Sequence, residues 1–223
     1  YKKLGVPVGM VDCYQGGSSI TCWLEKGILE SMPEAEGYLR DFEEATRDQK
    51  PGEYETALRE YNALVEKHLE LSAKAKAENP DISQEELDEI AGCYPWPPPI
   101  GLKSAFRPGG LIETMFKRVA PYTVRGILYY QGEEDAVRNY DYTIDSQKAS
   151  DSNDICDKGF NIMYKNLLKT LISEYRSLYN EDDLPVIIVQ LPMFIERNTV
   201  DRRDWAYLRE AQEAAVNEDR KSV

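Results

Sequence analysis

The fold is decided by the stretch Val124-Arg125-Gly126-Ile127-Leu128-Tyr129-Tyr130-Gln131-Gly132-Glu133-Glu134-Asp135-Ala136. Its first half is a short apolar run typical of a buried strand, and its second half breaks at a glycine and presents an amide and three carboxylates. Open α/β sheets place their chemistry at the C-terminal ends of parallel strands. Residues 6–19 repeat this form, with an apolar run that ends in Tyr14-Gln15-Gly16-Gly17-Ser18-Ser19. Two such strand ends in one domain predict an active-site rim.

Strand and helix patterns alternate through the rest of the chain. They predict strands over residues 6–13, 124–130 and 185–190, and helices over residues 19–30, 110–120, 160–179 and 204–217. The strands are short and β-branched, as expected where helices cover both faces of a sheet. The predicted fold class is therefore α/β, with a parallel sheet in a three-layer domain. A complete sheet of this kind has about five strands, and the chain opens at Tyr1 without Met, so we expect an internal piece of a longer polypeptide.

The negative charge of the chain belongs mainly to one segment. The net charge is -13, and residues 33–92 carry 17 Asp and Glu against 7 Lys and Arg, a net charge of -10. Helical patterns cover residues 34–48, 53–77 and 84–91, and Ser83 with Glu86 predicts a capping box. We expect residues 33–92 to be an acidic helical insertion in an α/β domain made of residues 1–32 and 93–223. In the simplest interpretation the charged faces of these helices lie in solvent and their apolar stripe packs against the protein. An acidic protein-docking arm is the alternative.

Two further segments have open roles. Pro95-Trp96-Pro97-Pro98-Pro99 forbids helix and favours an extended polyproline conformation that returns the chain to the main domain. Trp96 then either covers the core or lines a carbohydrate site. Residues 137–158 are expected to form a long loop, which is either a lid over the site or an ordinary surface loop.

Composition excludes several classes of partner. The net charge of -13 disfavours nucleic acid and anionic membranes, and no apolar run reaches the length of a membrane span. The four cysteines show no CxxC spacing and only His68 accompanies them, so a zinc site is not expected. Reduced thiols favour a cytoplasmic location, although a disulfide between Cys13 and Cys22 stays open. The sequence implies no cofactor and leaves the oligomeric state unknown.

The chain offers no convincing nucleophile with a paired base. Ser18 or Ser19 lies on a tight strand-to-helix turn, like a nucleophile elbow. The base would have to be His68, the single histidine, and His68 lies in the charged helical insertion. A solvated or packed helix residue is the simpler explanation there. Ser18 is better explained as a helix N-cap or a hydroxyl that contacts a ligand.

Backbone and amide donors are the stronger candidates. Gly16 and Gly17 let backbone N–H groups approach a ligand, and the helix that follows adds partial positive charge, so this turn can hold an oxyanion. The amide of Gln131, before Gly132, can donate to the same charge. Glu133 can orient a neighbouring group or accept a sugar hydroxyl.

The neighbouring carboxylates need partners. Glu134 and Asp135 would be costly to bury unpaired. At least one should face solvent or pair with Arg107 or Arg138. Three adjacent carboxylates can indicate a metal, but no second cluster of ligands accompanies them, so no metal is expected.

The chain resembles the sialate O-acetylesterase-like branch of the SGNH hydrolase superfamily in four stretches that occur in family order. They are Val6-Pro7-Val8-Gly9-Met10-Val11-Asp12 with Gln15-Gly16-Gly17-Ser18-Ser19-Ile20 and Trp23; Arg107-Pro108-Gly109-Gly110-Leu111 with Ala120-Pro121-Tyr122 and Arg125-Gly126; Tyr129-Tyr130-Gln131-Gly132-Glu133; and Leu184-Pro185-Val186 with Val189-Gln190-Leu191, Trp205 and Leu208-Arg209-Glu210-Ala211-Gln212. The resemblance covers most of the chain outside the insertion. It implies an SGNH or flavodoxin-like three-layer sheet.

The resemblance also implies a serine esterase that removes acetyl groups from carbohydrate hydroxyls. The family's Gly-Gln-Ser-Asn type nucleophile motif and Asp-x-x-His type motif are both absent, so the catalytic serine and histidine are expected outside this chain, which alone should be inactive. The oxyanion and substrate-binding residues implied are Gly16, Gly17, Gln131, Gly132 and Glu133, with Ser18, Arg107 and Asp135 as further substrate contacts. The family commonly has Ser-Asn where this chain has Glu134-Asp135. Since an ionised Asp135 cannot donate to an oxyanion, Gln131 is the expected amide donor.

The predicted function is therefore a fragment of a carbohydrate O-acetylesterase, acting on acetylated sialic acid or acetylated plant polysaccharide. The alternative is a non-catalytic carbohydrate-binding or interaction protein that kept the rim and lost the catalytic ends. Whether the gene continues in both directions with the two missing motifs separates these two hypotheses.

Overall fold

The computed structural model describes residues 2–136, 155–194 and 204–219. The chain divides into two compact units, one made of Tyr1–Arg40 with Pro108–Val223 and the other of Asp41–Arg107. Helix α2, Glu36–Thr46, begins in the first unit and ends in the second. The loop expected over residues 137–158 falls mostly outside the described residues.

Both boundaries of the second unit lie later in the chain than those predicted for the insertion. At the first boundary, Tyr38 Oη donates to Asp135 Oδ1 at 2.7 Å and ties the start of α2 to the first unit. At the second, Tyr61 Oη donates to the Pro95 carbonyl at 3.1 Å. This bond ties the proline-rich segment to α3, Glu53–Glu78, within the second unit, and not to the main domain as expected from the sequence.

The helices of the second unit follow the sequence pattern closely. Helix α3 and helix α4, Gln84–Ala91, match the predicted ranges. The capping box is confirmed, because the Glu86 N–H donates to Ser83 Oγ at 3.3 Å and the Ser83 N–H donates to Glu86 Oε2 at 3.0 Å. A reciprocal cap satisfies two backbone donors that the helix itself leaves unpaired, which fixes where α4 begins.

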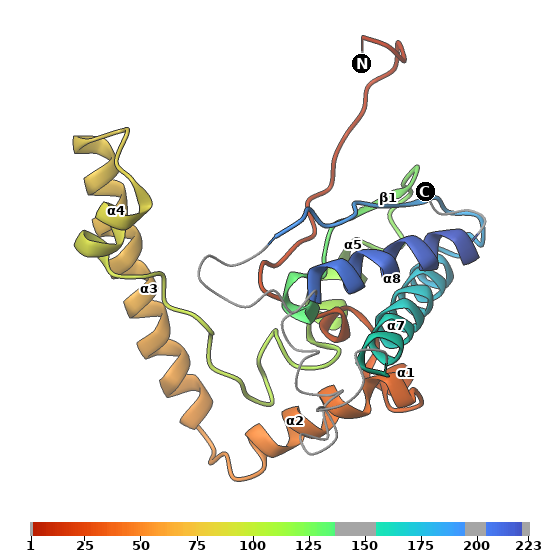
Figure 1. Ribbon diagram of the computed structural model, residues 1–223, viewed down its shortest axis with the longest axis horizontal. Coiled ribbons are helices and arrows are strands. Elements are labelled where there is room, and N and C mark those ends of the chain that lie inside the picture. The colour runs from red at the N-terminus through yellow and green to blue at the C-terminus, as the bar shows by residue number, and fades with distance from the viewer. Residues whose placement is uncertain (1, 137–154, 195–203, 220–223) are drawn as a thin grey trace. The chain divides into compact units, whose positions relative to one another are not determined.

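The first unit carries the remaining elements (Figure 1). In chain order its helical elements are η1 (Ile20–Trp23), α1 (Lys26–Leu29), η2 (Pro33–Ala35), η3 (Ile112–Phe116, a π-helix), α5 (Lys117–Val119), α7 (Ile155–Tyr179) and α8 (Asp204–Glu218). Two short strands, β1 and β2, stand between them. The predicted helices over residues 110–120, 160–179 and 204–217 are confirmed, and the helix expected over residues 19–30 is broken into η1 and α1.

The described sheet has two parallel strands. Strand β1, Ile127–Tyr129, pairs with β2, Val186–Ile188, in the register that sets Tyr129 against Ile188. Tyr129 and Val186 are buried on one face, whereas Leu128 and Ile187 on the other face are 60% and 43% exposed. The two strands predicted over residues 124–130 and 185–190 are therefore confirmed, and the described residues cover one face of their sheet.

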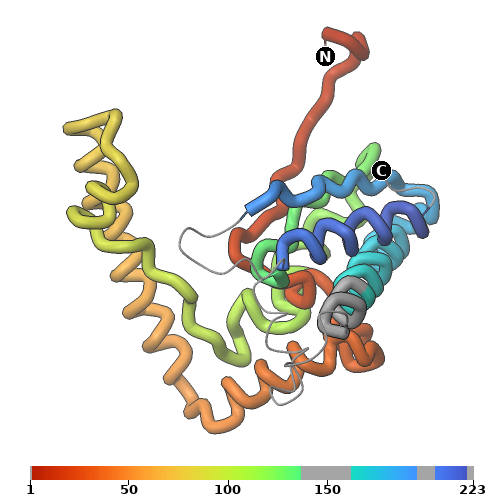
Figure 2. The backbone as a smooth tube through the Cα atoms, viewed as in Figure 1, coloured from red at the N-terminus to blue at the C-terminus, as the bar shows by residue number. Residues whose placement is uncertain are grey.

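Helix α7 forms the centre of the first unit and lies beside α8 (Figures 1 and 2). Its fully buried leucines and isoleucine recur at helical spacing, at Leu167, Leu168, Leu171 and Ile172. On α8 the buried positions Leu208, Ala211 and Ala215 share one stripe. The small alanines let the two helices approach closely, so burial of these stripes supplies the main stabilisation of the unit.

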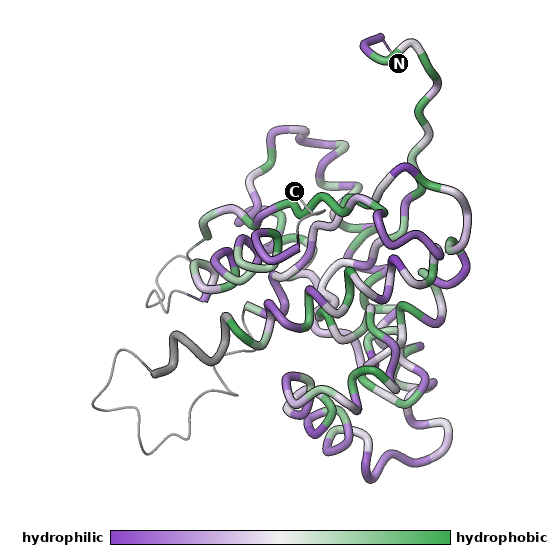
Figure 3. Tube along the Cα trace, turned by 90° about the vertical axis from the view of Figure 1, so that its right-hand side faces the viewer, coloured by the Kyte–Doolittle hydropathy of each residue, from purple (hydrophilic) through white to green (hydrophobic). Residues whose placement is uncertain are grey.

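The strand predicted over residues 6–13 is wrong for this structure. The segment is irregular, and its apolar side chains are exposed, with Val6 at 54%, Val8 at 59% and Met10 at 71%. Figure 3 shows it as an extended trace with apolar stretches. An apolar run becomes a strand only where a neighbouring strand satisfies its backbone groups. Within the part of the chain that the structure describes, β1 and β2 pair with each other and no strand pairs with residues 6–13.

No helix among residues 2–136, 155–194 and 204–219 has the length and apolarity needed to cross a bilayer. Cys13 and Cys22 are thiols, without a disulfide between them.

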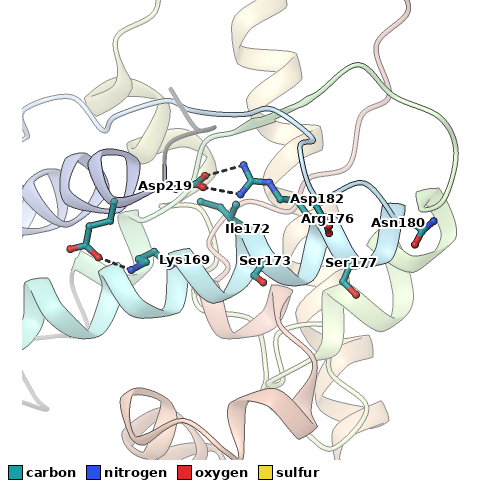
Figure 4. A pocket seen from close by; sticks show the side chains of 9 residues that line it. Lys169, Ile172, Ser173, Arg176, Ser177, Asn180, Asp182 and Asp219 are labelled. Atoms are coloured by element: carbon teal, nitrogen blue, oxygen red, sulfur yellow. Dashed lines mark hydrogen bonds and ion pairs between the residues drawn. The ribbon is translucent and has the colours of Figure 1, made fainter.

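A charged hollow of about 450 Å³ marks the junction of α7 and α8 (Figure 4). Its charged side chains pair with one another, since Arg176 Nη1 and Nη2 donate to the two oxygens of Asp219 at 2.9 Å, and Lys169 pairs with Glu218. Arg176 Nε also donates to the Leu184 carbonyl at 3.1 Å. One guanidinium therefore holds together α7, the end of α8 and the loop that enters β2. None of the predicted site residues lines this hollow.

Replacement of Arg176 is expected to destabilise the first unit. Arg176 is 9% exposed, so Arg176→Met leaves the Asp219 carboxylate and the Leu184 carbonyl without this donor and should cost about 2–4 kcal/mol of unfolding free energy in urea titrations. Lys26→Met is the matched control, because the Lys26–Glu30 pair has both side chains more than half exposed and should change stability by less than about 0.5 kcal/mol. Equal effects of the two substitutions would contradict this assignment.

A carboxylate on α7 caps helix α1. The Glu25 N–H donates to both oxygens of Glu174, at 3.1 and 3.3 Å. Burial raises the pKa of the Glu174 carboxyl to about 7; the Glu25 N–H opposes the shift, the Glu25 carboxylate adds to it, and the Lys117 ammonium opposes it. Glu174 is therefore a buried acid that titrates near neutral pH.

This titration should make stability depend on pH. Between the ordinary pKa of a glutamate, near 4.5, and about 7, folded Glu174 keeps a proton that the unfolded chain has released. Stability contributed by Glu174 is therefore present below that window and is lost as pH rises through it. Glu174→Gln should flatten the decline measured by urea unfolding at pH 5, 6, 7 and 8. Parallel curves for the two proteins would contradict the assignment.

Candidate active site

Strand β1 leads into a helical turn, and the predicted site residues from Gln131 to Asp135 lie at this junction. After Tyr129 the chain passes through Gln131 and Gly132, and the Ala136 N–H donates to the Gly132 carbonyl at 2.8 Å to close the turn. Gly132 has a φ of 142°, a conformation that is essentially restricted to glycine. A Cβ there would lie 2.6 Å from Leu208 Cδ2. Glycine at this position therefore lets α8 pack directly on the strand end.

Asp135 is the centre of the arrangement. Its carboxylate is fully buried and accepts hydrogen bonds from the Ile20 N–H at 2.9 Å, from Tyr38 Oη at 2.7 Å and from Gln131 Nε2 at 2.5 Å. These donors come from η1, α2 and the end of β1. Three donors offset much of the cost of removing a carboxylate from water. Asp135 therefore joins three parts of the chain at one point.

Every hydrogen-bonding group of the Gln131 side chain has a partner within the protein. Its Nε2 donates to the Ser18 carbonyl at 2.9 Å as well as to Asp135. Its Oε1 accepts from Tyr129 Oη at 3.0 Å and from Tyr164 Oη at 2.9 Å. Because both amide hydrogens point to these acceptors, the geometry corrects the expectation that this amide is free to donate to an oxyanion. Gln131 instead holds the turn at Ser18 against the end of β1.

The turn of residues 15–20 is therefore fixed at two points. Gln131 holds its Ser18 carbonyl and Asp135 holds its Ile20 N–H. These two turns, residues 15–20 and 131–135, form the rim. The Ser18 hydroxyl donates to the Gln15 carbonyl at 2.7 Å and accepts from Trp23 Nε1 at 2.9 Å. Both hydrogen bonds of the Ser18 hydroxyl join it to residues close by in the chain and stabilise the turn.

The glycines of the rim face solvent. Gly16 and Gly17 are exposed, and Gly17 has a φ of 66° that favours glycine. Within the part of the chain that the structure describes, the Gly17 N–H has no acceptor. A backbone N–H of an exposed residue in a turn held at two points can donate to an anionic oxygen of a ligand.

The two tyrosines behind the rim stay neutral. Burial raises the pKa of Tyr129 and of Tyr164 well above its usual range, and the nearby Asp135 carboxylate raises both further. Their hydroxyls therefore act as hydrogen-bond donors to Gln131 across the physiological pH range.

Helix α8 completes the support through Gln212. Its Nε2 donates to the Gln131 carbonyl at 3.1 Å, and its Oε1 accepts from the Leu191 N–H at 3.0 Å. Gln212 is fully buried. A buried amide that bridges two strand ends is consistent with a positioning role. The sequence contained a signal for it, since Gln212 belongs to one of the stretches that carry the family resemblance, whereas Tyr38 and Tyr164 carried none.

The structure brings most of the predicted site residues together. Gly16, Gly17, Ser18, Gln131, Gly132 and Asp135 all belong to the rim. Glu133 lies on the same helical turn with its side chain exposed. Arg107 ends the second unit, where its Nη1 donates to the Ser104 carbonyl at 2.8 Å. The expected partner Arg138 lies outside the described residues.

The single histidine packs inside the second unit. His68 is 9% exposed; its Nδ1 lies 3.3 Å from the Ala91 carbonyl and its Nε2 lies 3.3 Å from Ser72 Oγ. Tyr94 packs edge-on against the ring at 5.4 Å. These contacts are those of a packed helix residue that joins α3 to the end of α4.

No group of three or more His, Cys, Asp or Glu side chains positioned to bind a metal ion is found among residues 2–136, 155–194 and 204–219. Asp135, the buried carboxylate of the rim, accepts hydrogen bonds from protein donors.

Comparison with known proteins identifies the family of this chain. The family model described as carbohydrate esterase, sialic acid-specific acetylesterase matches residues 107–222, which include Gln131, Asp135 and Gln212. No curated protein and no solved structure matches the chain significantly. The matched region spans just over half of the 223 residues and holds one of the two turns of the rim with its supports. The chain therefore belongs to the carbohydrate esterase family of sialic acid-specific acetylesterases.

Proposed function

We propose that the chain forms the oxyanion-binding and substrate-binding part of a carbohydrate O-acetylesterase of the sialate or acetyl-xylan type. The proposed reaction is serine acyl transfer, and the proposed complete fold is the three-layer SGNH sheet, of which β1 and β2 are two strands. A cytoplasmic location is part of the proposal. The family assignment and the fixed geometry of the rim support the proposed esterase function.

One observation carries the proposal: hydrogen bonds within the protein fix the rim. Asp135 and Gln131 hold the turn of residues 15–20 at its Ile20 N–H and Ser18 carbonyl. Gly17, directly before Ser18, is an exposed residue, and among the described residues its N–H has no acceptor. Fixed donors stabilise a developing oxyanion because no reorganisation is needed during the reaction.

In the proposed mechanism a serine oxygen attacks the carbonyl carbon of a sugar acetate while a general base takes the serine proton. The carbonyl oxygen becomes an oxyanion that accepts a hydrogen bond from Gly17. Collapse breaks the bond to the sugar oxygen, which receives the proton and leaves as an alcohol. Water then attacks the acetyl-serine while the base takes a proton from it, and the serine oxygen regains that proton as acetic acid leaves and ionises. Gln131 and Asp135 keep Gly17 in place throughout.

The serine and the base come from residues outside this sequence in our proposal. The Ser18 hydroxyl donates to the Gln15 carbonyl and accepts from Trp23, and His68 packs within the second unit against Ala91 and Ser72. Neither has the geometry of a nucleophile paired with a base. Without them only binding and oxyanion stabilisation remain, which leaves a small fraction of the full rate.

Acetate release tests the proposal. The full-length protein and residues 1–223 alone are incubated with O-acetylated sialic acid, acetylated xylan and p-nitrophenyl acetate, and acetate is quantified. We expect the full-length protein to hydrolyse at least one sugar acetate and the isolated chain to show a rate at least about a thousandfold lower. Equal rates for the two proteins would contradict the assignment of the nucleophile and base.

A non-catalytic carbohydrate-binding protein is the second candidate. The observation that favours it is the Gln131 amide, both of whose hydrogens are bound within the protein. This candidate predicts that the full-length protein binds acetylated sugars and releases no acetate from any of the three substrates.

A further inference from the structure

The second unit presents an exposed tryptophan on a fixed support. Trp96 is 48% exposed, although a tryptophan buries more apolar area than any other side chain when it enters a core. The sequence left two roles open for it, as a cover for the core or as a contact for a carbohydrate. Within the second unit almost half of its surface remains in solvent, so it does not serve as a core residue there.

The backbone on each side of Trp96 is anchored. Tyr61 Oη donates to the Pro95 carbonyl at 3.1 Å, directly before the tryptophan. Gln49 Nε2 donates to the Ile100 carbonyl at 3.0 Å, after the run of prolines. Each proline fixes its own φ. The segment therefore has little conformational freedom left to lose.

The indole ring is itself supported. It packs edge-to-face on Phe106, with ring centroids 6.0 Å apart and an interplanar angle of 81°. Gly101 brings the chain close to α3, since a Cβ at this position would lie 2.5 Å from a ring carbon of Tyr54. A side chain held in this way loses little entropy when a ligand binds to it.

We propose that Trp96 is the stacking platform of a second carbohydrate-binding site, and that its ligand is a neutral polysaccharide chain. This proposal rests on the proposed function, because it names the substrate class of the esterase. A pyranose ring has an apolar C–H face bordered by hydroxyls, and it matches the flat apolar face of an exposed indole. Binding at Trp96 adds affinity for the polymer that the proposed esterase acts on.

The charge of the second unit selects a neutral chain. Residues 41–107 carry 15 Asp and Glu against 8 Lys and Arg, a net charge of -7. A polyanion such as polysialic acid would be repelled by this field, and the repulsion would weaken as salt screens it. A neutral polymer is not affected.

The proline run favours this site over recognition by a proline-binding domain. Such domains grip exposed prolines of a polyproline helix. Pro97 is exposed, but Pro98 and Pro99 are half-buried, so the run presents a single exposed proline beside the 48% exposed Trp96. Within residues 95–99 the indole of Trp96 is the larger of the two exposed side chains.

Binding of xylan to the full chain tests the proposal. Affinity is measured by calorimetric titration with deacetylated xylan and with polysialic acid, for the wild-type protein, Trp96→Ala and Trp96→Phe. We expect Trp96→Ala to weaken xylan binding at least about tenfold and Trp96→Phe, which keeps an aromatic face, to weaken it less than about threefold. Tyr122→Ala is the matched control, since Tyr122 is a 70% exposed aromatic residue of the first unit, and it should bind as wild type does.

Each outcome decides the proposal. Unchanged xylan affinity in Trp96→Ala, no xylan binding by the wild-type protein, or binding of polysialic acid as tight as that of xylan would overturn it. Failure of the proposed esterase function is distinguishable, because binding through Trp96 would persist without acetate release. In an active full-length protein, Trp96→Ala should raise KM for acetylated xylan and leave kcat for p-nitrophenyl acetate unchanged.

Discussion

Gly132→Ala should cost the first unit about 4 kcal/mol of unfolding free energy. Two effects add. The φ of 142° is strained for any residue with a Cβ, at about 1–3 kcal/mol. The new methyl group would lie 2.6 Å from Leu208 Cδ2 and 3.3 Å from Leu191 Cδ1, and overpacking of this kind costs about 1–3 kcal/mol. Urea unfolding monitored by circular dichroism measures the sum.

Gly27→Ala is the matched control. Gly27 lies in α1, and a Cβ there meets nothing within 4 Å. Because alanine is the better helix former, this substitution should be neutral or stabilise by up to about 1 kcal/mol. If the two substitutions gave the same change in stability, close packing of α8 on the end of β1 would not be the reason for glycine at position 132.

Asp135→Ala should be comparably severe, with a loss of about 3–5 kcal/mol. The substitution leaves the Ile20 N–H, Tyr38 Oη and Gln131 Nε2 without their buried acceptor. Unsatisfied buried donors each cost about 1–3 kcal/mol. The loss should appear as a lower midpoint in urea unfolding, followed by the near-ultraviolet circular dichroism of the tyrosines behind the rim.

Asp135→Asn separates the hydrogen bonds from the charge. The asparagine oxygen can take the place of Oδ2, which accepts from Ile20 and Gln131, and its amide can donate to the Tyr38 hydroxyl in place of Oδ1. We therefore expect a loss of only about 1–2 kcal/mol. As an exposed control on the same turn, Glu133→Gln should change stability by less than about 0.5 kcal/mol. Equal losses for asparagine and alanine at position 135 would show that the charge itself is required.

The same geometry accounts for the departure from the family pattern at position 135. The resemblance suggests an asparagine at this point and raises the question whether an aspartate can serve. In the structure Asp135 is an acceptor of three hydrogen bonds inside the protein, so either residue can hold the rim. In the proposed mechanism the donor to the oxyanion is the backbone at Gly17.

The sequence predicted the helices and the strand that are decided by residues close to one another in the chain. Helix α4 follows from its capping box, and α7 and α8 follow from apolar residues at helical spacing. Strand β1 followed from a short apolar run that ends at Gly132. In each of these elements the residues that decide the structure lie within a few positions of one another, so the sequence alone contains the information.

Features that depend on distant partners were missed or misjudged. The apolar run over residues 6–13 has the pattern of a strand, but a strand also needs a neighbour, and the pattern says nothing of one. Tyr38 and Asp135 are separated by 97 positions, so no motif predicted their bond. The Gln131 amide was judged by its residue type as an oxyanion donor, whereas Ser18, 113 positions away, uses one of its hydrogens.

The central claim is that Asp135 positions the rim for acyl transfer, and kcat for p-nitrophenyl acetate in the full-length protein tests it most directly. Wild type, Asp135→Asn and Asp135→Ala are compared at a temperature where near-ultraviolet circular dichroism shows each to be folded, with Tyr38→Phe as a milder variant that removes one donor to Asp135. The account predicts that kcat falls at least about a hundredfold in Asp135→Ala, with KM changed less than about threefold, and that Asp135→Asn restores most of the rate. A folded Asp135→Ala protein with the wild-type kcat would contradict it.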